Sequence, residues 1–330
     1  MLDDRRSRVL QALIEEYIRT GEPVSSAAVL DRSGLDVSSA TIRNDLARLE
    51  SYGFVAQPHR SAGRVPTSQG YRFYVDHIGP GRLRSATRAR IEEFFTDVHR
   101  ELGRLLKETS GLLADLTHFP AVVIGPGIEK DTIHAVHLVR LGGRNVLLVV
   151  VADSGRVVQE VVTLEVEPTP RQLDAAERVI ERTVAGKCLS DVGAGTVDGR
   201  LSEAVRHIVA AVEERLRSGD DETGEVYVGG TAQLAQIWND LAVVQHLLSM
   251  LEAESTVREI LGDGGTGTTV KFGAELGDDV DLAVVSAEFD TGGRGTGRIG
   301  VLGPMRMDYR RTMRLVEEIG EILEVRLGSD

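Results

Sequence analysis

The hydrophobic pattern of the first fifty residues is that of three short helices. Apolar residues recur at helical spacing over 9–18, and Gly21 and Pro23 then end this helix. A second helix is predicted over 25–30 and a third over 38–49, each with a serine that can cap its amino end. In the third helix, apolar residues three or four positions apart form one stripe, so the opposite face is left to solvent.

Beyond the third helix the pattern changes to short extended segments. The segments 54–58 and 64–66 flank a turn for which Gly63 is suited. They predict a small hairpin, and a further helix follows over 68–78. The Gly-Pro-Gly sequence at 79–81 is typical of a linker.

A heptad-like seam follows, in which apolar positions alternate in steps of four and three, with Thr109 as the polar exception. Its members are residues 91, 95, 98, 102, 105, 109, 112 and 116. This spacing fits a coiled coil between subunits and fits equally well an amphipathic helix that packs in the core of its own domain. The sequence pattern leaves both interpretations open.

The rest of the chain mixes strands and helices. Closely spaced strands joined by glycine turns predict antiparallel meanders, and helical patterns lie between them. The fold class predicted from the whole pattern is therefore α+β, after a helical start with one hairpin. The main predicted strands are 121–124, 133–140, 145–151, 157–165, 269–272, 281–289 and 297–302, and the main helices are 171–185, 200–217, 241–261 and 308–327.

Charge is distributed unevenly along the chain. The formal net charge is −13, but residues 1–104 carry a balance of +2 and the remainder carries −15. The segment 57–74 holds three arginines and a histidine without one carboxylate. An acidic protein repels polyanions at long range, so this local basic strip is the part of the chain that favours nucleic-acid contact.

Composition excludes several other classes of protein. The 42% hydrophobic and 27% charged residues are close to the averages for soluble globular proteins. Cys188 is the single cysteine, so no intrachain disulfide can form, and no Cys/His spacing of a zinc site occurs. The first residues lack the apolar stretch of a signal peptide, and no apolar run reaches membrane-spanning length. We expect a cytoplasmic protein without membrane contact.

The exposed face of the third helix carries residues suited to reading base edges. In a major groove arginine pairs with guanine and asparagine with adenine, which makes Ser39, Arg43 and Asn44 candidates. The hairpin arginines Arg60 and Arg64 would contact phosphate or a narrowed groove. Ser25 and Ser26 lie at a helix amino end that can hold a phosphate on backbone N–H groups. A plain helical subdomain with the same caps remains the alternative.

Residues 295–300 satisfy the G-x-G-x-x-G pattern, but their context does not fit a dinucleotide site. Such a site needs a strand before the glycines and a helix after them. Here an apolar strand follows, so the glycines are interpreted as a hairpin loop. No constellation for hydrolysis or redox chemistry was found, and we predict a protein that is not an enzyme and has no metal site or cofactor.

Several long stretches closely resemble the HrcA family of heat-inducible transcription repressors. The resemblance covers both ends of the chain, whereas residues 130–222 match only in hydrophobic pattern. The stretches that carry it are 17–26, 37–46, 58–67, 70–76 and 297–309.

This resemblance implies a multidomain α+β protein. A winged helix-turn-helix DNA-binding domain would occupy residues 1–78 and a linker 79–84. A GAF-like α+β domain, split into 85–129 and 223–330, would carry an inserted α+β dimerisation domain at 130–222. Transferred residue by residue, the recognition helix would contribute Ser39, Thr41, Arg43 and Asn44, and the wing His59, Arg60, Ser61 and Arg64.

The resemblance also implies a function. A homodimer would bind an inverted-repeat operator in double-stranded DNA upstream of chaperone genes and repress them, and the GroEL chaperonin would maintain its activity. Two alternatives stay open at this level. One is a winged-helix regulator controlled by a small ligand in the α+β domain, and the other is an enzyme or ligand sensor for which the N-terminal helices serve as a docking module.

Overall fold

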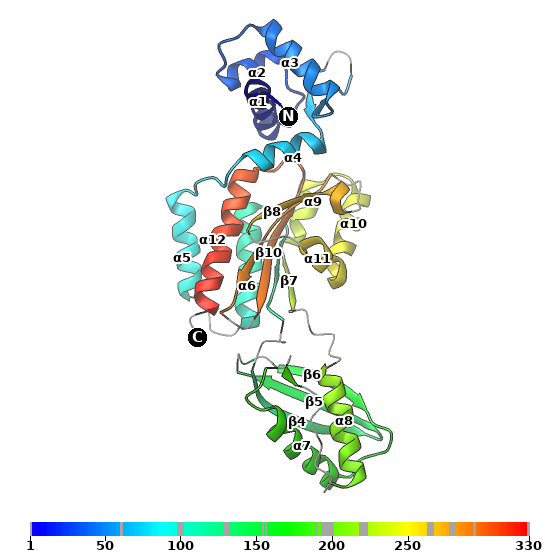
Figure 1. Ribbon diagram of the computed structural model, residues 1–330. Coiled ribbons are helices and arrows are strands. Elements are labelled where there is room, and N and C mark those ends of the chain that lie inside the picture. Colours follow the sequence, from blue (N-terminus) through cyan, green and yellow to red (C-terminus); the bar gives the residue numbers. More distant parts are fainter. Residues whose placement is uncertain are drawn as a thin grey trace.

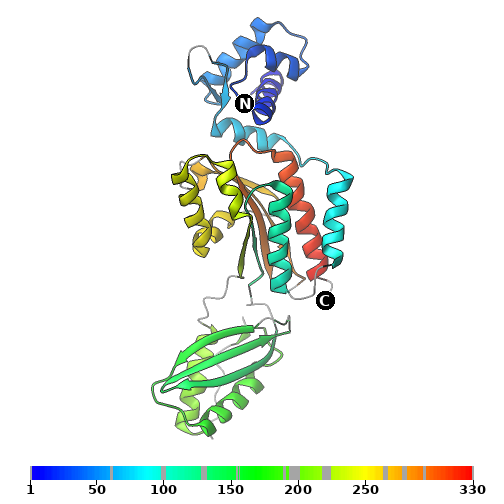
Figure 2. The same ribbon diagram turned by 180° about the vertical axis from the view of Figure 1, so that it is seen from behind.

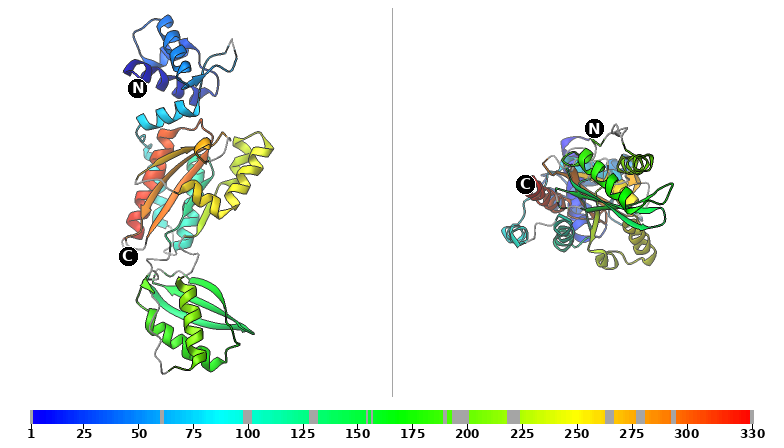
Figure 3. Two further views of the ribbon diagram at one scale, coloured as in Figure 1. Left: turned by 45° about the vertical axis from the view of Figure 1, so that its right-hand side comes forward. Right: turned by 90° about the horizontal axis from the view of Figure 1, so that it is seen from below.

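The protein is an elongated chain of three successive parts in this computed structural model (Figures 1 and 3). We call them the amino-terminal part (residues 2–78), the central part (79–127 and 224–328) and the distal part (132–217). The chain leaves the central part after one strand of its sheet and returns to it at another, with the distal part between. The structure describes residues 2–59, 62–97, 102–127, 132–153, 155, 157–188, 191–192, 201–217, 224–262, 267–276, 281–292 and 295–328.

Local signals fix the helices of the amino-terminal part. Asp3, Ser25, Ser38 and Thr67 each accept a backbone N–H from the first turn of the helix that follows, so every helix begins with a capped end. Gly21 ends the first helix with a left-handed backbone at φ 71°. The elements are α1 (Asp4–Thr20), α2 (Ser26–Ser33), α3 (Ser39–Ser51), β1 (Val55–Ala56), β2 (Val65–Pro66) and α4 (Ser68–His77).

The central part is a five-stranded antiparallel sheet with helices on both faces. Its strand order is β7-β3-β10-β9-β8, in which β8, β9 and β10 follow one another in the chain and β3 joins them to β7. The strands are β3 (Ala121–Ile124), β7 (Val226–Gly229), β8 (Thr269–Phe272), β9 (Ala283–Asp290) and β10 (Thr296–Gly303). One face packs against α6 (Leu102–Thr117) and α12 (Tyr309–Leu327), with α5 (Ser85–Asp97) beside α12, and the other face packs against α9 (Leu234–Ile237), α10 (Leu241–Glu252) and α11 (Glu254–Leu261) (Figures 1 and 2).

Alternate residues of the strands divide the core in two. In β3, Val123 belongs to the cluster beneath α6 and α12, and Val122 to the cluster beneath α10 and α11. The first of these clusters continues without a break into the amino-terminal part, where it includes Leu13 and Leu46. The amino-terminal helices and the α12 face of the sheet therefore share one hydrophobic core.

The heptad-like seam lies inside the molecule. It runs along two helices, α5 and α6, instead of one. Ile91 and Phe95 of α5, and Leu105 and Leu112 of α6, are buried in the central core. The seam is thus an amphipathic core pattern within one chain, and the coiled-coil interpretation is wrong for its described members, because those side chains already pack against their own sheet and α12. Residue 98 lies outside the described residues.

The distal part has a core of its own. A three-stranded antiparallel meander of β4 (Ile133–Gly142), β5 (Asn145–Ala152) and β6 (Val157–Thr163) is covered on one face by α7 (Pro170–Val184) and α8 (Glu203–Arg217). The turn at Gly142 and Gly143, both with positive φ, joins the first two strands as predicted. Thr169 and Gln172 form a reciprocal capping box that starts α7.

The hairpin-loop interpretation of the G-x-G-x-x-G sequence is confirmed for Gly295, which lies in the connection between β9 and β10, and is wrong for the other two glycines. Gly297 and Gly300 lie within β10, paired with β3 on one side and β9 on the other. A Cβ on Gly297 would lie 2.2 Å from the Phe289 ring, so the ring fills the space of a side chain. Packing across the sheet explains this glycine, and no nucleotide fold is involved.

Candidate nucleic-acid interface

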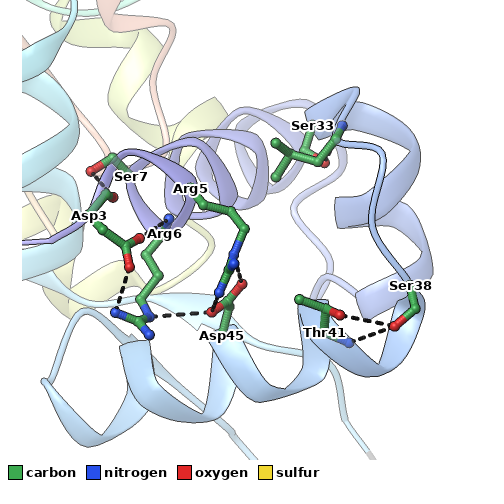
Figure 4. A network of polar contacts seen from close by, with 9 residues as sticks. Asp3, Arg5, Arg6, Ser7, Ser33, Ser38, Thr41 and Asp45 are labelled. Carbon is green, nitrogen blue, oxygen red and sulfur yellow. Dashed lines mark hydrogen bonds and ion pairs between the residues drawn. The ribbon is translucent and has the colours of Figure 1, made fainter.

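The exposed face of α3 is the most prominent polar surface among the predicted site residues. Arg43 and Asn44 are exposed, whereas Ser39 and Thr41 are half-buried. The Ser38 hydroxyl lies 3.0 Å from the Thr41 hydroxyl and accepts the Thr41 N–H at 3.2 Å, as Figure 4 shows. Thr41 therefore belongs to the amino-terminal cap of α3, and Arg43 and Asn44 are the exposed side chains that can bind a ligand.

Within the described part of the chain, the side chains of Arg43 and Asn44 have no hydrogen-bond or ion-pair partner. Arg48, one turn beyond Asn44, is exposed on the same face and is equally free within those residues. Arg48 was not among the predicted site residues, although its i+4 spacing from Asn44 was the signal that could have identified it. The face thus offers three unengaged polar side chains in a row.

The inner face of α3 is held to α1 by a buried carboxylate. Asp45 has 2% of its surface exposed and accepts two hydrogen bonds from Arg5, at 2.8 and 3.0 Å. The Arg6 guanidinium lies 3.3 Å from the same carboxylate (Figure 4). The hydrogen bond to Asp45 raises the pKa of the Arg5 guanidinium above its ordinary value. This contact fixes the rotation of α3 about its axis, and with it the direction in which Arg43 points.

Asp45 was not among the predicted site residues either. The one available signal was an acidic residue placed within the apolar stripe of the third helix. Its partners could not be identified from the sequence, because Arg5 lies 40 positions away and α1 carries several arginines.

The hairpin is attached to the segment between α1 and α2. Val24 and Arg64 exchange two backbone hydrogen bonds of 2.9 Å, which adds a third short extended segment beside β1 and β2. Gly63 passes so close to this segment that a Cβ would lie 2.3 Å from the Val24 carbonyl oxygen. Gln57 donates a hydrogen bond of 2.9 Å to the Ala62 carbonyl near the tip. The hairpin base is therefore rigidly placed beside the helices.

The predicted hairpin residues differ in their surroundings. His59 is exposed, and its carbonyl accepts the Ala62 N–H at 2.9 Å. Arg64 is half-buried, with its guanidinium 2.9 Å from the Glu50 carboxylate at the end of α3. Arg64 thus braces the hairpin against α3 in this structure. Arg60 and Ser61 lie outside the described residues.

The two serines at the start of α2 have separate positions. Ser25 is the exposed N-cap, and its hydroxyl accepts the Ala28 N–H at 3.2 Å. Ser26 is the first residue of the helix and is half-buried. An exposed, capped amino end of this kind can receive a phosphate oxygen.

An aromatic cluster joins α4 to the central part. Tyr71 and Tyr74 of α4 pack against Tyr309 of α12, with ring centroids 5.9 and 6.5 Å apart, and Tyr71 also lies 6.2 Å from Phe272. Arg72 stacks over Phe272 and pairs with Glu275. Burial raises the pKa of the Tyr71 and Tyr309 phenols, which stay neutral. The orientation of the amino-terminal part is therefore coupled to the central sheet.

The described residues contain neither a metal site nor a membrane-spanning helix. No group of three or more histidine, cysteine or acidic side chains there could hold a metal ion. None of the helices in those residues has the length and apolar character needed to cross a bilayer.

Comparison with known proteins gives one consistent result. The family model for the HrcA protein C terminal domain matches residues 103–313. The heat-inducible transcription repressor HrcA of Symbiobacterium thermophilum is 35% identical over 339 residues, which covers 98% of each chain. The HrcA repressor of Acidothermus cellulolyticus is 38% identical over 333 residues, covering 97% of each chain.

One solved structure, titled as a hypothetical protein at 2.2 Å resolution, matches the whole fold. It has a TM-score of 0.65 and 25% sequence identity, and the match covers 100% of this chain and 99% of the other. The family model, the near full-length relatives and the resemblance of the N-terminal motifs agree. The chain belongs to the HrcA family of heat-inducible transcription repressors.

Proposed function

We propose that this repressor binds an inverted-repeat operator upstream of chaperone genes as a homodimer, through a winged helix-turn-helix domain at residues 1–78. The observation that carries the proposal is the unengaged polar face of α3 beside a hairpin that is anchored to the helices. Residues 79–84 link this domain to a GAF-like domain, split into 85–129 and 223–330.

In this proposal α3 enters the major groove. Arg43 donates two hydrogen bonds to a guanine and Asn44 pairs with an adenine, each worth about 1–3 kcal/mol of discrimination against a wrong base. Ser39 and Thr41, nearer the amino end of α3, approach the adjoining bases or phosphates. Arg48 lies one turn further along the helix and contacts the flanking backbone.

The wing and the start of α2 contact the sugar-phosphate backbone. His59, Arg60 and Ser61 lie at or beside the hairpin tip in the sequence, and Arg64 at its base. Arg64 either keeps Glu50 as its partner and braces the wing, or exchanges it for a phosphate. Ser25 and Ser26 hold a phosphate at the amino end of α2. These contacts set affinity and register but carry no base information.

The distal part supplies the dimerisation domain, at residues 130–222. The face of its sheet opposite α7 and α8 is mostly apolar and uncovered within the described chain. It includes the half-exposed Leu147 and Val149 of the central strand, with His137 and Gln159 as the polar neighbours of Val149. Its most exposed members are Val139 at 47%, Leu141 at 54%, Val157 at 48% and Val161 at 53%. A second copy with the same face would bury both surfaces about a two-fold axis, the symmetry that an inverted repeat requires.

Heat inducibility calls for a signal that reports unfolded protein. In the proposal the GroEL chaperonin keeps the repressor active under normal conditions. During heat shock unfolded chains occupy the chaperonin, so it no longer maintains the repressor. Repressor activity then falls, and the chaperone genes are transcribed. The support for this step is the family itself, whose relatives are heat-inducible repressors.

Fluorescence anisotropy tests the proposal. A labelled duplex with the inverted repeat of a chaperonin operon is titrated with the protein at two salt concentrations, with and without GroEL, against a scrambled duplex. We expect tight, salt-dependent binding to the repeat alone, improved by the chaperonin. Equal weak binding to both duplexes under every condition would contradict the proposal and favour a regulator with another signal.

A further inference from the structure

A basic cavity lies where the linker meets the start of α12. Its volume is about 380 Å³, and it is lined by residues 81–84 and Thr87 on one side and by Asp308, Arg310 and Arg311 on the other. The Gly81 N–H donates a hydrogen bond of 2.8 Å to the Arg310 carbonyl, which holds the linker against α12. The cavity is thus built by two segments more than 200 positions apart.

Four arginines and a single carboxylate line this cavity. Arg82 and Arg84 are exposed and, within the described residues, have no ion-pair or side-chain hydrogen-bond partner. Arg311 donates to the Leu116 carbonyl at 3.0 Å. The Arg310 guanidinium lies 3.8 Å from the Glu15 carboxylate, a distance at which its charge is only partly compensated.

The carboxylate, Asp308, has a structural role of its own. It is the N-cap of α12, and it accepts the Arg311 N–H at 3.2 Å. Its single charge cannot balance four guanidinium groups. The lining therefore has an excess of positive charge, although the chain as a whole carries −13.

One turn away on the same helices, the arginines are neutralised. Arg314 of α12 and Arg88 of α5 both bind Glu318, which is almost fully buried. The neighbouring arginines are thus paired with a buried carboxylate, whereas the four guanidinium groups of the cavity have only Asp308 in the lining and Glu15 at 3.8 Å from Arg310. Unpaired like charges that face a common space repel each other, and an anionic ligand removes that repulsion.

We propose that this cavity binds a small ligand that carries two or more phosphate groups. Guanidinium groups bind phosphate oxygens through paired N–H donors, and several of them around one space suit a chain of phosphates better than a single one. The volume lies within the range of small-molecule sites. The start of α5 at Ser85, next to Arg84, adds the positive end of a helix dipole.

The phosphate comes from a small molecule and not from the DNA backbone. A duplex presents its phosphates on a convex surface, whereas this lining is concave. In Figures 1 and 2, α4 lies between α3 and the linker, so the cavity is separated from the exposed face of α3. A bound polyphosphate would tie the linker to α12 and so restrict the motion of the amino-terminal part.

Isothermal titration calorimetry of the full chain tests the site, with tripolyphosphate and inorganic phosphate as the probes. We expect tripolyphosphate to bind about tenfold or more tightly than inorganic phosphate, since more guanidinium groups are engaged. The double variant Arg82→Gln/Arg84→Gln should bind tripolyphosphate about tenfold more weakly. The matched control is Arg326→Gln at the other end of α12, an exposed arginine without a partner in the described residues, which should leave the affinity unchanged.

The outcomes separate this site from general charge effects and from DNA. Circular dichroism confirms that each variant is folded. An equal loss of tripolyphosphate affinity in the double variant and in Arg326→Gln would contradict the proposed site. The absence of tripolyphosphate binding to the unmodified chain would contradict it as well. The same variants are titrated with a random-sequence duplex. A loss of duplex binding in the double variant, without tripolyphosphate binding to the unmodified chain, would assign these arginines to DNA and overturn the proposal.

Discussion

At the scale of single residues, the functional hypothesis depends on side chains that the fold leaves unengaged. Arg43 is exposed on α3 without a partner in the described chain, so its hydrogen-bonding capacity is available to a base. We expect Arg43→Ala to reduce the preference for the operator over a scrambled duplex by about 1–3 kcal/mol, because a bidentate contact is lost. Anisotropy measures this difference. Arg326→Ala is the control, and equal effects of the two variants would contradict base reading by Arg43.

A second prediction concerns the contribution of Asp45 to the stability of the folded chain. Its buried carboxylate accepts charged hydrogen bonds from Arg5, so Asp45→Asn keeps the shape but weakens the bonds. We expect the free energy of unfolding to fall by about 1–3 kcal/mol. Urea denaturation measures this change, and Arg5→Gln is the reciprocal variant. A variant of unchanged stability would show that the ion pair does not hold α1 to α3.

Residues also show the limit of sequence-based prediction. Arg43 and Asn44 could be predicted, because a helix with one apolar stripe must expose the opposite face. Asp45 could not, because its role depends on Arg5 and Arg6, which only folding brings near. For the same reason the pairing of Arg64 with Glu50 was not predicted, although both residues lie in well-predicted elements.

At the scale of elements, the hairpin depends on a glycine. A Cβ at position 63 would meet the Val24 carbonyl oxygen at 2.3 Å, and backbone cannot yield as a flexible side chain does. We expect Gly63→Ala to separate the hairpin from the segment between α1 and α2, with a stability loss of about 1–3 kcal/mol. Hydrogen exchange at the Arg64 and Val24 amides measures the separation. Gly79→Ala is the control, since Gly79 has open space around it and, like Gly63, no left-handed backbone. If both amides stayed protected in Gly63→Ala, the close contact would not be what holds the hairpin.

The contact between α5 and α12 depends on pH. The hydrogen bond from Arg88 and the nearby Arg314 lower the pKa of Glu318 below its ordinary value of 4.5. A carboxyl whose pKa is lowered by folding stabilises the folded state above its unfolded pKa, and this contribution is lost as pH falls through the folded pKa. We expect stability to drop on acidification below about pH 4.5. Thermal unfolding should show a shallower drop for Glu318→Gln, and an identical pH profile would contradict the linkage.

Elements whose signals are local could be predicted, and those that depend on distant partners could not. The helix starts at Ser25 and Ser38 follow from serine caps next to apolar stripes. A strand over 297–302 could be predicted, but the need for glycine at position 297 could not, because the Phe289 ring of the neighbouring strand fills the space of its side chain. The heptad-like spacing was ambiguous because a partner helix and a sheet both require an apolar face.

At the scale of the whole molecule, two features connect the three parts. One core continues from the amino-terminal helices to the α12 face of the sheet, and the aromatic cluster around Tyr309 lies at this junction. The distal part has a separate core and joins the central part at β3 and β7. This arrangement suits a dimer in which the distal parts join the two copies and the amino-terminal parts face separate half-sites.

The last prediction concerns the uncovered face of the distal sheet and the oligomeric state of the protein. Val139 and Val161 lie in one row across this face, each aligned with Leu147 of the central strand. In the proposed dimer, a lysine in that row would place a charge at the apolar centre of the interface, so we expect Val139→Lys/Val161→Lys to convert that dimer to monomer. Because the core lies on the other face of the sheet, the monomer should keep its circular dichroism. Sedimentation equilibrium measures the change, and Arg171→Glu, an exposed site at the start of α7, is the control. A double variant that remains dimeric would exclude this face as the interface, whereas a monomer that also loses affinity for the inverted repeat would link the two-fold symmetry of the protein to that of the operator.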